Sequence, residues 1–253
     1  MYPYLELFDH KILTFPLIAL GAFAVCVLTY LRLPCYQPVF RFQVIRLLAV
    51  ILPCAALGGR ILSALTLAGG SAGLFFHYLV YGGAVFYGGL IGGWLGLFLV
   101  CLWKKHDFRM LSDVYASILP LGHGLARLGC FCNGCCYGCP WDGPLGVVYP
   151  VQREMIRVFP TWFAEAGFNL ALFAWLQHRS GRPDRGRITG TYLTMYPAFR
   201  FLIEFFRGDE IRGIWGSFST SQYISMILFL VGLVLLYQSR RQARPNYYFL
   251  ETP

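Results

Sequence analysis

Charged residues are scarce in this chain. They make up 13% of its 253 residues, whereas 57% are hydrophobic, and a soluble domain usually carries about 25% charged residues. A core of this size cannot hide so much apolar surface, so lipid must cover part of it. The formal net charge of +9 would suggest nucleic acid in a soluble protein. Here the basic residues lie mostly in short loops between apolar runs, which excludes a nucleic-acid partner.

Internal repeats and low-complexity linkers are also absent, and residues 67–79 carry no charge at all. These absences favour a single transmembrane domain over residues 1–253. Within it, the Gly-, Pro- and Cys-rich residues 130–159 form an external loop or small cap. The predicted fold class is an all-α membrane protein, a polytopic bundle of about seven transmembrane helices. The apolar runs that predict them are 11–31, 42–66, 80–103, 110–128, 160–177, 189–206 and 219–238.

Basic residues flank alternate connections between these runs, which predicts the orientation. Thirteen of the 21 Lys and Arg residues lie there: Arg32, Arg41, Arg46, Lys104, Lys105, Arg109, Arg179, Arg182, Arg185, Arg187, Arg240, Arg241 and Arg244. The positive-inside rule then places the N-terminus outside and the C-terminus in the cytoplasm. The fourth and sixth runs are the least apolar, which is typical of helices that face the interior of a bundle.

Three arginines lie in or at the outer ends of predicted helices: Arg60, Arg127 and Arg200. An arginine inside a span costs about 2.5–3.5 kcal/mol on insertion scales, so each needs a partner or a role. Snorkelling or pairing with a carboxylate accounts for any one of them. All three fall near the same predicted membrane face, where guanidinium groups can bind a phospholipid phosphate in a bidentate way.

The sixth run places Arg200, Glu204 and Arg207 on one helix face at spacings of four and three. An internal ion-pair ladder is one interpretation, and an arginine held in position for phosphate is a compatible one. Around Gly88 and Gly89, overlapping GxxxG units favour close helix packing. Tyr87, just before them, is either an interface anchor or a hydrogen-bond donor to substrate.

Five of the nine cysteines fall within ten residues: Cys130, Cys132, Cys135, Cys136 and Cys139. Disulfides in an oxidising compartment are the favoured interpretation, although five is an odd number. A metal site is the second, but the spacing is not that of a zinc ribbon. A reactive thiolate near Arg127 is the third.

These residues resemble the prolipoprotein diacylglyceryl transferase family. The segment from Ala126 to Gly138 is similar to the family signature, in which Arg-x-Gly-Asn-Phe precedes Asn-Gly-Glu. The similar segments in this chain are Tyr87-Gly88-Gly89-Leu90-Ile91-Gly92, Phe199-Arg200 with Glu204-Phe205-Phe206-Arg207, Asp113, Gln222 with Ser225, and more weakly Pro160-Thr161 with Glu165. They follow one another in the family's order from about Arg60 to Gln222.

The resemblance implies a seven-span transferase of lipoprotein biosynthesis in the bacterial cytoplasmic (inner) membrane, with its site near the outer leaflet. The family moves diacylglycerol from phosphatidylglycerol to the lipobox cysteine of exported prolipoproteins and releases glycerol phosphate. It implies no metal or other cofactor, and its partners are phosphatidylglycerol, the prolipoprotein and membrane lipid.

The same resemblance implies roles for individual residues. Arg127 and Arg200 would be catalytic, with Tyr87 and Cys135 beside them. Substrate would be bound by a larger set: Arg60, Asn133, Gly134, Gly88, Gly89, Glu204 and Arg207.

Three positions depart from the family pattern. Cys135 replaces the family's Glu, Tyr87 its His and Cys130 its Asn. The two most obvious proton acceptors are therefore missing, while the arginines remain. Two alternatives stay open: a paralogous transferase with a different acceptor, and a non-catalytic protein that binds or moves phospholipid.

Overall fold

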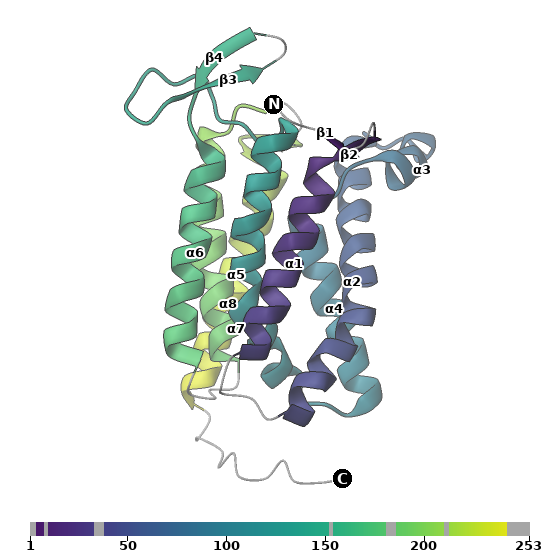
Figure 1. The fold of residues 1–253 in the computed structure, drawn as a ribbon. Coiled ribbons are helices and arrows are strands. Elements are labelled where there is room, and N and C mark those ends of the chain that lie inside the picture. The colour runs from purple at the N-terminus through teal and green to yellow at the C-terminus, as the bar shows by residue number, and fades with distance from the viewer. Residues whose placement is uncertain are drawn as a thin grey trace.

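The chain forms an elongated helical bundle. The computed structural model describes residues 4–7, 10–32, 38–151, 154–180, 186–209 and 213–241. Over these residues there are eight α-helices: α1 (Thr14–Arg32), α2 (Pro38–Leu67), α3 (Ala72–Tyr81), α4 (Phe86–Lys104), α5 (Phe108–Asn133), α6 (Thr161–Ser180), α7 (Arg187–Ile203) and α8 (Thr220–Arg241). All of them except α3 lie side by side along the bundle (Figure 1).

The prediction of about seven transmembrane helices is not confirmed in number, because the described residues form eight helices and α3 lies largely in a stretch expected to be a loop. Its ten residues extend only about 15 Å, half the thickness of the hydrocarbon layer. It therefore lies at one end of the bundle rather than along it (Figure 1). The predicted sixth span is also too long: α7 ends at Ile203 and is followed by a 3₁₀ turn, Glu204–Phe206.

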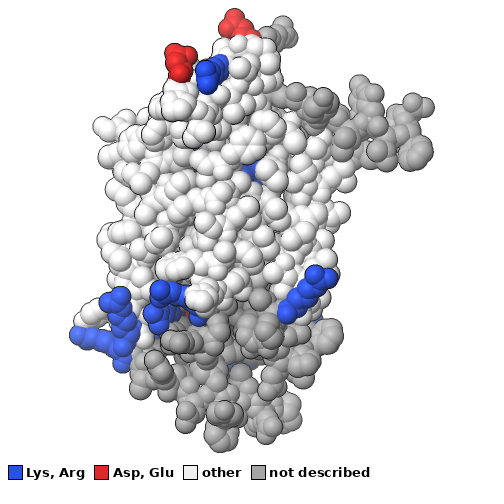
Figure 2. Space-filling view, turned by 60° about the vertical axis from the view of Figure 1, so that its left-hand side comes forward, with Lys and Arg blue, Asp and Glu red and all other residues white. Residues whose placement is uncertain are grey.

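Among the described residues, four helices are long and apolar enough to cross a membrane: α1, α4, α8 and residues 43–67 of α2. Their outward side chains include Leu20, Leu65 and Leu99, which are 65%, 59% and 55% exposed. In Figure 2 the middle of the visible face is almost entirely white, and Lys and Arg gather toward one end. Such a surface is suited to lipid rather than water, and the chain is a membrane protein.

Glycines allow α2 and α4 to approach closely. A Cβ atom added to Gly88 would lie 2.3 Å from the carbonyl oxygen of Gly58, and one added to Gly92 would lie 2.4 Å from that of Cys54. No side chain fits between backbones at that distance. The GxxxG spacing therefore serves helix packing, and a larger residue at Gly88 would push the two helices apart.

Polar side chains fix the other helices relative to one another. The Asp113 carboxylate accepts hydrogen bonds from the backbone N–H groups of Gly186 and Thr189, both at 2.8 Å, and from the Thr189 hydroxyl at 2.7 Å. This caps the start of α7 with a residue of α5 and satisfies N–H groups that a helix start leaves unpaired. The Tyr87 and Ser225 hydroxyls, 2.6 Å apart, join α4 to α8.

One end of the bundle carries a small antiparallel hairpin, β3 (Val147–Val151) and β4 (Glu154–Val158) (Figure 1). Tyr149, Val158 and Trp162 form a core beneath it. Two further strand pairs are β1 (Tyr4–Leu7) with β2 (His10–Leu13), and β5 (Ile214–Trp215) with β6 (Phe218–Ser219).

Of the loop arginines used to predict orientation, Arg182, Arg185 and Arg244 lie outside the described residues.

Candidate functional site

Helix α5 presents a polar face toward the hairpin end of the bundle. His123, Arg127 and Cys130 follow one another at spacings of four and three, so they lie on one side of the helix. His123 and Arg127 are each only 6% exposed. The prediction that the polar residues of this run face the interior is confirmed for both.

Arg127 begins a chain of alternating charges that runs from α5 through α6 to α7 and the turn after it. Its Nη2 lies 2.5 Å from the Glu165 carboxylate of α6, which lies 3.6 Å from Arg200 of α7. Arg200 is 2.6 Å from Glu204, and Glu204 is 4.0 Å from Arg207. The Nε and Nη2 groups of Arg207 also bind the two oxygens of the Asp209 carboxylate. Three positive and three negative groups thus neutralise one another in the interior.

Two guanidinium groups of this chain of charges have buried donors that are not fully hydrogen-bonded. Within the part of the protein that the structure describes, Arg127 Nε has no hydrogen-bond partner, and Arg200 Nη1 has only the Glu165 carboxylate, at 3.6 Å. Leaving a buried charged donor unsatisfied costs free energy, so such atoms mark a place for a ligand. A phosphate or another oxyanion can accept hydrogen bonds from such donors. Glu165 lies between the two arginines and fixes their positions.

Arg60 does not join this cluster. Its exposed side chain donates hydrogen bonds to the backbone carbonyls of Leu79 at 3.2 Å and Val80 at 2.6 Å, which ties α2 to α3. Gly88 and Gly89 face α2 and contact its backbone rather than the arginines. The resemblance implies that these three residues bind substrate, but their contacts in the structure join α2 to α3 and to α4.

Tyr87 is buried beside the cluster, with only 2% of its surface exposed. Its ring packs edge-on against Tyr196, with centroids 6.0 Å apart, and its hydroxyl is engaged by Ser225. Tyr87 therefore supports the wall of the site, and could donate a hydrogen bond to a substrate only by leaving Ser225.

The cysteine loop follows α5 directly. Asn133 is the last residue of the helix. Gly134 follows it in the left-handed conformation, with φ of 79°, and terminates the helix. This turn brings Cys135 back to Cys130, whose carbonyl oxygen lies 3.7 Å from the Cys135 Sγ. Among the described residues, Cys130, Cys132, Cys135, Cys136 and Cys139 all carry free thiols. The expected disulfide is therefore not confirmed.

One thiol of this loop is distinctive electrostatically. Hydrogen bonds from the Cys130 and Cys135 thiols outweigh burial and hold the pKa of the Cys136 thiol well below its usual value. Arg207 and Arg127 act in the same direction. Neighbouring thiols and guanidinium groups thus favour the ionised form of Cys136.

Sequence reasoning gave too little weight to Glu165 and His123. Glu165 is only 1% exposed and is shared by Arg127 and Arg200. The signal available in the sequence was a row of polar residues at helical spacing: Thr161, Glu165 and Asn169. The structure buries all three. His123 stacks on Phe86 with ring centroids 3.8 Å apart. Both of its ring nitrogens are buried and lack a hydrogen-bond partner among the described residues, so it is a further candidate for contact with a polar ligand.

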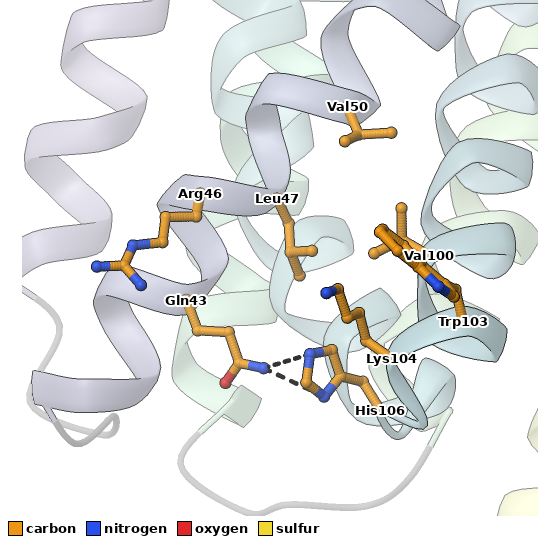
Figure 3. Close-up of a pocket in the computed structure, with 8 residues that line it drawn as sticks. All are labelled: Gln43, Arg46, Leu47, Val50, Val100, Trp103, Lys104 and His106. Atoms are coloured by element: carbon orange, nitrogen blue, oxygen red, sulfur yellow. Dashed lines mark hydrogen bonds between the residues drawn. The ribbon is translucent and has the colours of Figure 1, made fainter.

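A groove of about 690 Å³ lies near the opposite end of the bundle, between α2 and α4 (Figure 3). Gln43 Nε2 lies 2.7 Å from His106 Nε2 within it, and Arg46 and Lys104 line it. None of the residues of the arginine cluster lines this groove, so it is a separate feature.

Comparison with known proteins points to one family. The family model described as prolipoprotein diacylglyceryl transferase matches residues 4–238. A protein of Bordetella avium named phosphatidylglycerol–prolipoprotein diacylglyceryl transferase is 39% identical over 170 residues, which are 66% of this chain and 64% of that protein. A protein of the same name from Clostridium tetani is 35% identical over 60% of this chain and 62% of that protein. The match thus spans somewhat under two thirds of each relative. With the family model covering nearly all of its length, this chain belongs to the prolipoprotein diacylglyceryl transferase family.

Proposed function

We propose that this protein transfers diacylglycerol from phosphatidylglycerol to the lipobox cysteine thiol of an exported prolipoprotein and releases glycerol phosphate. The observation that carries the proposal is the pair of buried arginines, Arg127 and Arg200, which share Glu165 and keep donors that are not fully hydrogen-bonded. The names of the relatives give the donor and the acceptor that such an anion site would serve.

The chemistry follows from the charges. The acceptor sulfur attacks the glycerol carbon that bears the phosphate, an S–C bond forms, and the C–O bond to phosphate breaks with its electron pair on oxygen. Negative charge therefore grows on the leaving phosphate. Fixed guanidinium groups in a site without water stabilise that charge more than water would, and they require no reorganisation during the reaction. We assign this role to Arg127 and Arg200, with Glu165 and Glu204 as the groups that position them.

The proposed orientation places the arginine cluster at the outer leaflet. Among the described residues, the hairpin end carries Asp142, Glu154 and Arg157, whereas the opposite end carries a basic group: Arg32, Arg46, Lys104, Lys105, Arg109, Arg179, Arg187, Arg240 and Arg241. This asymmetry agrees with the positive-inside rule. Prolipoproteins arrive at the outer face, so the cluster would meet them there.

Tags test this orientation. We expect an epitope inserted near Gly143 to be reached by an impermeant label in intact cells, and tags in the 104–109 and 179–187 segments to be labelled only after permeabilisation. A tag at Gly143 that stays protected until the cells are opened would contradict the orientation and the outer-leaflet site together.

Complementation tests the function. In a bacterium depleted of its own transferase, expression of this chain should restore growth and membrane-anchored lipoproteins. The matched control is a chain that carries Arg200→Lys and is shown to reach the membrane in equal amount. Restored growth with both chains would exclude the arginine mechanism, and failure with a well-expressed wild-type chain would favour a different acceptor or a non-catalytic role.

A further inference from the structure

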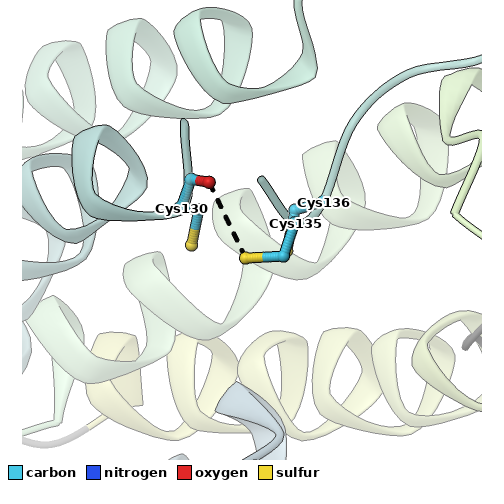
Figure 4. Close-up of side chains that lie close together, drawn as sticks. All are labelled: Cys130, Cys135 and Cys136. Carbon is cyan, nitrogen blue, oxygen red and sulfur yellow. Dashed lines mark hydrogen bonds between the residues drawn. The ribbon is translucent and has the colours of Figure 1, made fainter. Parts of the chain in front are cut away.

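Three cysteine side chains at the end of α5 and in the loop after it converge on one point. The Sγ atoms of Cys130, Cys135 and Cys136 all lie within 4.8 Å of one another. Cys130 comes from the last turn of α5, while the other two come from the loop that Gly134 turns back (Figure 4). The Cys135 N–H donates to the Cys130 carbonyl at 3.3 Å, which fixes this return.

The surrounding core holds the loop in this shape without a disulfide. The Trp162 indole N–H donates to the Cys135 carbonyl at 2.6 Å, and the Thr161 hydroxyl donates to the Cys136 carbonyl at 2.7 Å. Both donors are fully buried. Cys136 has φ of 60°, in a left-handed region that non-glycine residues seldom adopt, and such strain is typical of functional sites.

Three sulfurs fit a metal ion better than a disulfide. A disulfide would join two of them and leave the third thiol without a role. In a tetrahedral zinc site the Zn–S distance is about 2.3 Å, which places neighbouring sulfurs roughly 3.8 Å apart. The observed cluster needs only small side-chain movements to reach that geometry. Three protein ligands leave a fourth position open, as in catalytic rather than structural zinc sites.

The charges around the cluster suit such an ion. Zinc with three thiolates carries a net charge of −1. Two arginines lie near it: Arg127 is on the same face of α5 as Cys130, and Arg207 pairs through its backbone with Gly138, two residues after Cys136. Because Arg127 precedes Cys130 by three residues on α5, the thiolate cluster lies about one helical turn from the proposed phosphate site.

We propose that Cys130, Cys135 and Cys136 form a three-thiolate zinc site whose open position receives the thiol of the acceptor. This role rests on the proposed transferase activity. Binding to zinc releases the proton of the acceptor thiol to solvent and leaves a thiolate, which is the nucleophile that the transfer requires. Its sulfur then forms the S–C bond while the phosphate leaves toward Arg127 and Arg200. The family's Glu and His are absent from this chain, and a metal-bound thiolate makes a dedicated base unnecessary.

Metal content of the purified full-length protein tests the site independently of activity. We expect about one zinc ion per chain, and a thiolate-to-metal charge-transfer band when the metal-free wild type is titrated with Co²⁺. Each of three substitutions should abolish tight zinc binding: Cys130→Ser, Cys135→Ser and Cys136→Ser. Two substitutions in the same segment should keep the zinc: Cys132→Ser and Cys139→Ser. The Co²⁺ titration of the wild type does not depend on any variant folding. No thiolate band, or a disulfide within the three found by intact-mass analysis of protein prepared without reductant, would overturn the proposal.

A second measurement tests the role of the ion. Removal of zinc with a chelator should reduce transfer to a lipobox peptide at least tenfold, and added Zn²⁺ should restore it, while binding of phosphatidylglycerol is unchanged. Transfer that survives loss of zinc would overturn the acceptor role and leave the metal site standing. Absence of transfer in zinc-loaded protein that still binds the lipid would instead contradict the proposed function.

Discussion

Replacing either Arg127 or Arg200 by lysine is expected to slow diacylglyceryl transfer by about 10²–10³-fold, which is the cost of losing one donor to a developing oxyanion. The substitution keeps the positive charge and can keep the ion pair with Glu165. It removes the planar fork that contacts a carboxylate and a phosphate together. The loss should therefore appear in kcat as well as in kcat/KM, because the missing contact is strongest in the transition state.

The matched control is Arg157→Lys. Arg157 lies on β4 and donates from Nε to the Gly146 carbonyl at 3.2 Å, outside the charge network. Its substitution should leave transfer within about twofold of the wild type, because an exposed arginine contributes little. If folded Arg127→Lys and Arg200→Lys also kept the wild-type rate, the phosphate would have to bind elsewhere.

Replacing Glu165 by glutamine is expected to destabilise the protein more than any other isosteric change in the cluster. The carboxylate is 1% exposed and faces two arginines. Removing one member of a buried ion pair costs about 3–5 kcal/mol, because the partner's charge remains buried without compensation. The melting temperature in detergent should then fall by at least about 6 °C.

Glu154→Gln is the control for this change, because Glu154 is an exposed residue of β4. Its melting temperature should stay within about 1 °C of the wild type. Equal melting temperatures for Glu165→Gln and the wild type would mean that the two arginines do not depend on Glu165, and the proposed positioning role would be wrong.

The sequence predicts the bundle well because hydrophobic runs and loop charges report directly on lipid. It predicts the ends of α1, α6 and α8 to within three residues, and it places Arg127 and Arg200 in the interior. It misses α3, because ten apolar residues beside glycines read equally well as a loop. It extends α7 too far, because helical spacing from Arg200 to Arg207 continues in sequence after the backbone has tightened into a 3₁₀ turn.

Contacts between distant segments explain what the sequence leaves open at the site. The sequence makes Arg60 a candidate for a third phosphate ligand. In the structure its guanidinium group instead donates hydrogen bonds to the carbonyls of Leu79 and Val80 in α3. The sequence segment around Glu165 matches the family pattern only weakly. In the structure α6 places Glu165 between two arginines. The cysteine run allows several pairings on spacing alone, and only the turn at Gly134, with the donors from Trp162 and Thr161, selects Cys130, Cys135 and Cys136.

The most direct test of the central claim is mass spectrometry of the purified protein incubated with phosphatidylglycerol and a synthetic lipobox peptide. The account predicts that the peptide gains one diacylglyceryl group on its cysteine thiol and that one glycerol phosphate is released for each peptide modified. A peptide with serine in place of that cysteine should stay unmodified. Folded, zinc-loaded protein that binds phosphatidylglycerol yet leaves both the cysteine peptide and the lipid unchanged would contradict the account.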